Sequence, residues 1–182
     1  ICLFNQNGYH ATSMQDIARA VAIKKPSLYH HFDSKEAILL AILESGVTYL
    51  IEDIDAVVRS GLDSASKLRA AVRAHAQLLA THPGAAAIFL REDRGLGEEY
   101  MQEYVAKRDR VEHLLRAIIE QGIAAGDFRP TDVPITAHAL LGMVNWMTRW
   151  YRPEGRLSAA QIADLFTDLF LEGLRRPPDG AA

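Results

Sequence analysis

Apolar residues recur at intervals of three and four along most of this 182-residue chain, and no long stretch alternates apolar with polar residues. Such intervals are typical of α-helices that bury one face, whereas alternation would indicate strands. Glycine and proline stand mainly between the periodic segments, where they end helices. The pattern therefore predicts an all-α fold of about nine helices. We expect these helices over residues 1–7, 13–20, 25–31, 35–58, 64–81, 85–92, 98–125, 133–151 and 159–175.

Two short predicted helices near the N-terminus, 13–20 and 25–31, are separated by a short turn. Thr12 is a good N-cap for the first, and Pro26 lies in the first turn of the second, where a missing N–H costs little. Ala18 is small where the two helices must cross. These features predict a helix-turn-helix, whose second helix enters the DNA major groove. The apolar residues expected between the two helices are Ile17, Val21, Ile23, Leu28 and Phe32.

The last two predicted helices are apolar on nearly every side, so each must be covered on both sides. A chain of this size cannot easily bury both of them alone. We therefore expect two copies to associate through residues 133–151 and 159–175 as a four-helix bundle. The predicted organisation is a helix-turn-helix DNA-binding domain over 1–46, with a truncated first helix, followed by a ligand-binding and dimerisation domain over 47–182.

Composition fits a globular protein, since 49% of the residues are hydrophobic and 24% are charged. As a whole-chain average, the net charge of −3 argues mildly against nucleic-acid binding. The distribution of charge changes that conclusion. Residues 1–35 carry four basic and two acidic side chains, whereas residues 36–182 carry sixteen basic and twenty-one acidic ones. The sequence therefore predicts a short basic DNA-reading segment on an acidic body.

Several kinds of protein are disfavoured by what the sequence lacks. One cysteine cannot form an intramolecular disulfide framework and fits a reducing cytoplasm. No apolar run reaches about 18 residues, so we expect no membrane span. The adjacent His30 and His31 point about 100° apart on a helix and cannot chelate one ion together. The sequence contains no His-Glu-x-x-His motif, serine nucleophile elbow or cysteine pair. We expect a cytoplasmic protein that is not an enzyme and has no metal site or cofactor.

The segment from Gly8 to Glu36 carries a longer pattern. It resembles the N-terminal domain of the TetR family of bacterial transcription regulators, whose signature begins Gly-Tyr-x-x-Thr-(Ser/Thr)-hydrophobic-x-x-Ile-Ala and ends Leu-Tyr-x-(His/Tyr)-Phe-x-x-Lys-Glu. Ala22 departs from the family, which usually has Gly there. If this position needs a positive φ, Ala costs about 1 kcal/mol. The matching residues are Gly8, Tyr9, Thr12, Ser13, Met14, Ile17, Ala18, Leu28, Tyr29, His31, Phe32, Lys35 and Glu36.

The polar residues of this segment suit DNA, because lysines neutralise phosphates and hydroxyl groups donate hydrogen bonds to them. By the resemblance, the first residues of the second helix and His30 read base edges, while Thr12, Tyr29 and Lys35 contact phosphates. A solvated basic face would also explain an isolated pair of lysines. The residues expected to contact DNA are Thr12, Lys24, Lys25, Pro26, Ser27, Tyr29, His30 and Lys35.

The C-terminal helices are expected to enclose a pocket for a small apolar effector. Its candidates are aromatic and methionine residues near the middle of the bundle, with histidine and arginine as polar anchors, although an ordinary core explains each of them equally well. The segment 145–153 resembles the corresponding helix of TetR-type regulators of fatty-acid and steroid breakdown, some of which respond to acyl-coenzyme A. The expected ligand-binding residues are His75, Phe89, Met101, Tyr104, Arg108, Met143, Trp146, Met147 and Trp150.

With the resemblance, these features predict a homodimeric DNA-binding regulator. The family consists mostly of repressors, so we expect a repressor that a small apolar effector releases from a palindromic operator. An acyl-coenzyme A or a related lipid metabolite is the expected effector. The alternative is a small helical enzyme or lipid-carrying protein that uses the same apolar pocket and has no affinity for duplex DNA.

Overall fold

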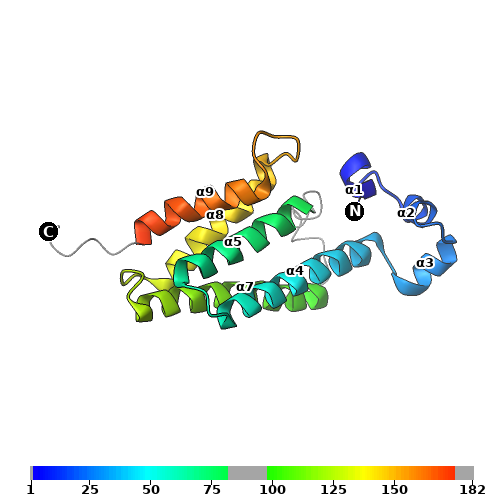
Figure 1. The fold of residues 1–182 in the computed structure, drawn as a ribbon. Helices are drawn as coiled ribbons and strands as arrows, with labels where there is room; N and C mark the ends of the chain where they lie inside the picture. The colour runs from blue at the N-terminus through cyan, green and yellow to red at the C-terminus, as the bar shows by residue number, and fades with distance from the viewer. Residues whose placement is uncertain (1, 82–97, 175–182) are drawn as a thin grey trace.

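The computed structural model describes residues 2–81 and 98–174, and all secondary-structure elements there are α-helices (Figure 1). The predicted all-α fold is thus confirmed, and the helix boundaries within the described residues agree with those expected to within one residue. The helix expected over 85–92 lies outside the described residues. The helices are α1 (Cys2–Asn7), α2 (Met14–Ala20), α3 (Lys25–His31), α4 (Lys35–Arg59), α5 (Ser64–Thr81), α7 (Glu98–Ala125), α8 (Val133–Trp150) and α9 (Ala159–Leu174).

Side-chain caps fix where α2 and α4 begin. The Ser13 hydroxyl oxygen accepts from the backbone N–H of Asp16, and the Asp16 carboxylate accepts from the backbone N–H of Ser13, so the two residues form a capping box on α2. Ser13 therefore holds the N-cap position that the sequence assigned to Thr12. At the start of α4, the Ser34 hydroxyl accepts from the N–H of Ala37 in the same way.

A small apolar cluster holds α2 and α3 together against the beginning of α4. Ala18 is 2% exposed in this cluster, which confirms the expectation of a small residue between the two helices. Few side chains contribute to it, so α2 and α3 depend on α4 for part of their burial. The buried members of this small cluster are Met14, Ala18, Leu28 and Ile38, and the partly buried ones are Ile17, Phe32 and Ile42.

The main core lies among α4, α5, α7, α8 and α9, which form the body of the molecule. Arg69 and Arg73 of α5 make ion pairs with Asp164 of α9, and Arg69 also pairs with Asp168. These side chains are partly exposed, so the ion pairs contribute little and the apolar contacts between the helices dominate stability. Among the described residues, no helix is both long enough and apolar enough to cross a membrane.

Helix α4 belongs to both apolar clusters. Ile38 lies in the small cluster, while its neighbour Leu39 is 1% exposed in the main core. In Figure 1, α4 runs from the end of the molecule that carries α1–α3 into the helical bundle. Because a continuous helix transmits displacement along its axis, α4 is the direct mechanical connection between the two parts.

Candidate nucleic-acid interface and internal cavity

The turn between α2 and α3 has the hydrogen bonds of a Schellman motif. The N–H of Ile23 donates to the carbonyl of Ala18 at 3.0 Å, and the N–H of Ala22 donates to the carbonyl of Arg19 at 3.2 Å. Among the described non-glycine residues, Ala22 alone has a positive φ, at +55°. The position where the family usually has Gly therefore does need a left-handed conformation, which costs an L-residue about 1 kcal/mol.

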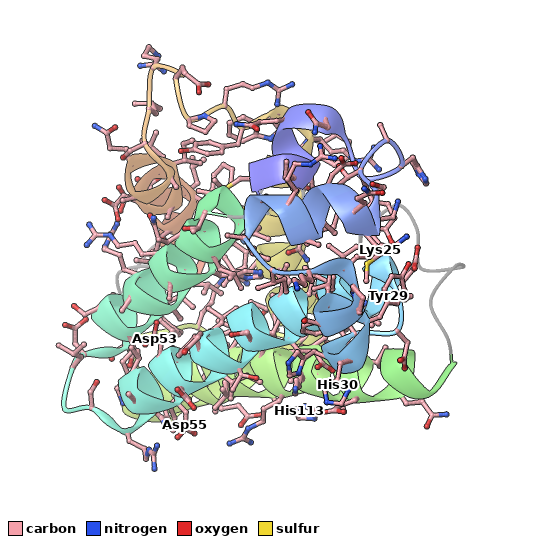
Figure 2. All side chains as sticks on the ribbon, turned by 90° about the vertical axis from the view of Figure 1, so that its right-hand side faces the viewer. Lys25, Tyr29, His30, Asp53, Asp55 and His113 are labelled. Atoms are coloured by element: carbon pink, nitrogen blue, oxygen red, sulfur yellow. The ribbon has the colours of Figure 1, made fainter. Side chains whose placement is uncertain are left out.

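Helix α3 and the residue before it present a group of exposed residues, which we call the α3 face. Leu28 points into the small cluster and so fixes which side of the helix is exposed. On the α3 face, the ammonium nitrogen of Lys25 lies 5.6 Å from the centroid of the Tyr29 ring. Figure 2 labels Lys25, Tyr29 and His30 on this helix, which faces the viewer. The α3 face consists of Lys24, Lys25, Pro26, Ser27, Tyr29 and His30.

Thr12 differs from the expectation of a phosphate contact. Its side chain is 1% exposed, and its hydroxyl donates to the backbone carbonyl of Gly8 at 2.8 Å. A hydroxyl has only one proton to donate, so this bond competes with any bond to a phosphate. In this structure, Thr12 instead fixes the chain that leads into α2.

Lys35 is also held by the protein. Its ammonium group donates to the backbone carbonyl of Tyr9 at 2.8 Å and lies 4.3 Å from the centroid of the Tyr9 ring. The Tyr9 hydroxyl in turn donates to Glu36 at 2.8 Å. Burial opposes ionisation of the Glu36 carboxyl, but hydrogen bonds from its own N–H and from Tyr9 outweigh that effect and lower its pKa. Lys35 and Glu36 thus clamp the segment before α2 onto the start of α4.

A cavity of about 360 Å³ lies inside the body, between α4, α5, α7 and α8. The residues from α4 and α5 are aliphatic or glycine except His75, whereas α7 and α8 contribute most of the polar side chains. The cavity therefore has an apolar wall and a polar wall. Its lining consists of Ile42, Leu43, Gly46, Val47, Leu50, His75, Leu78, Leu79, Tyr104, Arg108, Asp109, Val111, Glu112, His138, Leu141, Gly142 and Asn145.

Of the expected ligand-binding residues, His75, Tyr104 and Arg108 line this cavity. Met147 is buried in the main core instead, and Met143 does not contribute to the lining. The two tryptophans are not among the lining residues: Trp146 is 63% and Trp150 42% exposed, because α8 turns this side outward. Phe89 and the side chain of Met101 lie outside the described residues.

Sequence reasoning missed Asp109 and Glu112 of α7 and the polar lining residues of α8. Glu112 forms an ion pair with Arg116 one turn away and lies 3.1 Å from Nε2 of His138 on α8. Asn145 lies on the same side of α8 as His138. The spacing of His138, Leu141, Gly142 and Asn145 at intervals of three and four could have indicated a common helix face. The contact with Glu112 depends on tertiary packing.

Two titratable groups in the cavity are uncharged at neutral pH. Burial lowers the pKa of His75 to about 4, so its imidazole is neutral. Burial raises the pKa of Tyr104 to about 12, although the nearby charge of Arg108 acts in the opposite direction. The buried part of the cavity therefore offers hydrogen-bonding groups without a net charge.

A two-helix unit with an exposed basic face, joined by one long helix to a bundle with an internal cavity, defines the class of helix-turn-helix transcriptional regulators. The model of the bacterial regulatory proteins, tetR family, matches residues 2–42, and that of the tetracyclin repressor-like C-terminal domain matches residues 61–174. The chain belongs to the TetR family and is a DNA-binding transcriptional regulator rather than an enzyme.

Similarity to known proteins extends over nearly the whole chain. The HTH-type transcriptional repressor KstR2 of Rhodococcus jostii strain RHA1 is 33% identical over 178 residues, which are 96% of this chain and 87% of that protein. The structure of the TetR family regulator PfmR from Thermus thermophilus has a TM-score of 0.86 and 38% identity, covering 96% of both chains. AibR in complex with isovaleryl coenzyme A and operator DNA has a TM-score of 0.75 and 34% identity, covering 92% of this chain and 91% of AibR.

Proposed function

We propose that this protein is a homodimeric, cytoplasmic repressor that binds a palindromic operator and leaves it when a small, largely apolar effector enters the internal cavity. Residues 1–46 are its DNA-binding domain and residues 47–182 its ligand-binding and dimerisation domain. The observation that carries the proposal is the position of Ile42 on α4. Its side chain lines the cavity and also packs on the small cluster behind the α3 face.

The α3 face supplies the DNA contacts in this proposal. Lys25, Ser27 and His30 project toward base edges in the major groove, with Pro26 in apolar contact beside them, while Lys24 and Tyr29 contact phosphates. Thr12 and Lys35 support the α3 face in this proposal rather than contacting phosphates. Their bonds to backbone carbonyls orient α2 and α4, and so position the α3 face.

Dimerisation is supported by apolar side chains that α8 and α9 leave exposed. Trp146 of α8 and Leu169 of α9 are each more than 60% exposed. Contiguous exposed apolar surface is characteristic of protein interfaces. A two-fold axis at these helices would place two α3 faces on successive half-sites of a palindrome. The exposed apolar residues of the proposed interface are Ile135, Trp146, Trp150, Leu165 and Leu169.

Two similar proteins support repression as the mode of regulation and an acyl-coenzyme A as the class of effector. The Rhodococcus relative is a transcriptional repressor, and AibR was solved with isovaleryl coenzyme A. The aliphatic residues of α4 and α5 suit the acyl group of such a thioester. An effector shifts operator affinity only through its different affinities for the two conformations, so contact with α4 is the step that couples them.

The test begins with selection of duplexes from a random pool, followed by fluorescence anisotropy with the selected sequence. We expect isovaleryl coenzyme A or a longer acyl-coenzyme A to weaken binding. Tyr29→Ala should lower operator affinity about tenfold, because it removes a phosphate contact. Tyr49→Ala, which alters an exposed tyrosine on α4 outside the α3 face, is the control and should leave affinity unchanged. If no duplex is enriched and wild type binds DNA no better than Tyr29→Ala, the enzyme or lipid-carrier alternative is favoured.

A further inference from the structure

His75 is the polar exception on the apolar wall of the cavity. It is 9% exposed and makes no hydrogen bond within the part of the chain that the structure describes. Among those residues, Nε of Arg116 is the only fully buried side-chain nitrogen or oxygen that has no hydrogen-bond partner. The ring nitrogens of His75 are therefore unpaired but open to the cavity.

An unpaired polar group at this depth is unfavourable. Buried polar groups are nearly always hydrogen-bonded, because leaving one unpaired forfeits its bonds to water. The neighbours of His75 on the apolar wall, such as Leu78, Leu79 and Val47, have no side-chain group that could pair with it. A ligand with a hydrogen-bonding group opposite His75 restores the missing hydrogen bond. The cavity should therefore bind such a ligand more tightly than one that is apolar at this position.

The neutral state of the His75 imidazole decides which ligand group can pair with it. A neutral imidazole donates one hydrogen bond and accepts one, so it can pair with a carbonyl or a hydroxyl oxygen. It cannot offset the charge of a carboxylate, whose burial without a counter-charge is very costly. The charged side chains that line the cavity all come from α7; those of Arg108 and Asp109 are exposed, and Glu112 is already paired.

We propose that His75 determines effector specificity by hydrogen bonding to an uncharged oxygen, a carbonyl or hydroxyl, on a ligand whose apolar part lies along α4 and α5. Any charged group of that ligand lies at the wall formed by α7 and α8, in contact with water. This inference rests on the proposed effector role of the cavity, and it extends that role from apolar effectors in general to those with a buried neutral oxygen.

The test measures direct binding to the full chain by calorimetry at neutral pH, without DNA. The probes are 2-decanone and decanoate, which have the same number of carbons but carry a neutral carbonyl at carbon 2 and a terminal carboxylate, respectively. We expect His75→Leu to weaken binding of 2-decanone about tenfold, since one hydrogen bond to a buried group is lost. The affinity for decanoate, which is held with its carboxylate at the polar wall, should change less than about twofold in His75→Leu.

Two further variants separate recognition from structure. His75→Gln keeps an amide donor and acceptor and should retain 2-decanone binding within about threefold. His113→Leu makes the same change as His75→Leu at an exposed α7 residue outside the cavity lining and should change neither affinity. His75→Leu should melt at the same temperature as wild type or higher, because it removes an unpaired buried group.

The proposal is overturned if wild type binds neither probe or if His75→Leu binds 2-decanone as tightly as wild type. It is overturned as well if His75→Leu weakens the binding of decanoate by the same factor as that of 2-decanone. It is also overturned if His75→Leu is less stable and binds both probes unchanged, which is the behaviour of an ordinary core residue. Operator binding is measured separately. If wild type recognises 2-decanone as expected but binds no operator, that result would count against the repressor function alone.

Discussion

The α3 face and the internal cavity are built in opposite ways. The α3 face comes from one short stretch of chain, Lys24 to His30, and needs only α2 and α4 behind it. The cavity takes its lining from four helices between Ile42 and Asn145. A surface made from one helix is set by local sequence, whereas a cavity is set by how separate helices pack. The two regions should therefore respond differently to the same kind of substitution.

The largest difference is expected for leucine truncation. Leu140→Ala removes a side chain with no exposed surface from the main core and should lower the free energy of unfolding by about 4 kcal/mol. Leu28→Ala in the small cluster should cost about 2 kcal/mol, because fewer atoms surround the side chain and they can move into the space. Denaturant unfolding measures both values. Equal costs would mean that the two clusters are packed alike.

A second difference concerns pH and the cavity alone. The unfolded chain protonates His75 below about pH 6.5, whereas the folded chain does so only near pH 4, its lowered pKa. Between these values the unfolded state binds more protons, so stability falls as pH falls. Relative to His75→Leu, wild type should lose up to about 3 kcal/mol across this window and nothing above it. Parallel stability curves for the two proteins would contradict this prediction.

The third prediction concerns the α3 face alone. Lys24→Ala should weaken operator binding about tenfold and reduce the slope of log affinity against log salt by about one, since one phosphate-neutralising charge is lost. Lys107→Ala is the control, because Lys107 lies on α7 and pairs with Glu103 and Glu44. Anisotropy titrations at several salt concentrations measure both. An unchanged slope for Lys24→Ala would show that this residue does not neutralise phosphate.

The smallest effect is expected at the turn between α2 and α3. Ala22→Gly should stabilise the fold by about 0.5–1 kcal/mol, because glycine adopts the positive φ of this position without strain. The matched change Ala20→Gly, at the end of α2, should instead destabilise by about 0.5–1 kcal/mol. Thermal unfolding of the two variants should therefore shift in opposite directions. Shifts of the same sign would contradict the strain at Ala22.

The exposed residues of the DNA-binding segment were largely predictable, and its internal bonds were not. Periodicity and turn signals located α2 and α3, and Leu28 identified the buried side of α3. Thr12 and Lys35 were expected to contact phosphate because their side chains have the right chemistry. Their bonds to the carbonyls of Gly8 and Tyr9 depend on how the chain folds back over α4, which no local pattern encodes.

The cavity was predictable in position but only partly in composition. The aromatic and methionine residues of α8 suggested a ligand site, since such residues commonly line one. Trp146 instead lies on the outer side of α8, and the inner side carries His138 and Asn145. An apolar pattern that covers nearly every side of a helix does not reveal which side faces a cavity and which faces solvent. That choice follows from the packing of α8 against α5 and α7.

The sequence by itself determined the helices, the helix-turn-helix and the basic character of the segment before α4, because helix periodicity, caps and turn residues act over a few neighbouring positions. The tertiary structure alone decided that His75 is unpaired beside a cavity, that Glu112 meets His138, and that Ile42 contacts both the cavity and the small cluster. These relations join residues that are far apart in the chain. Only the packing of complete helices brings them within contact distance.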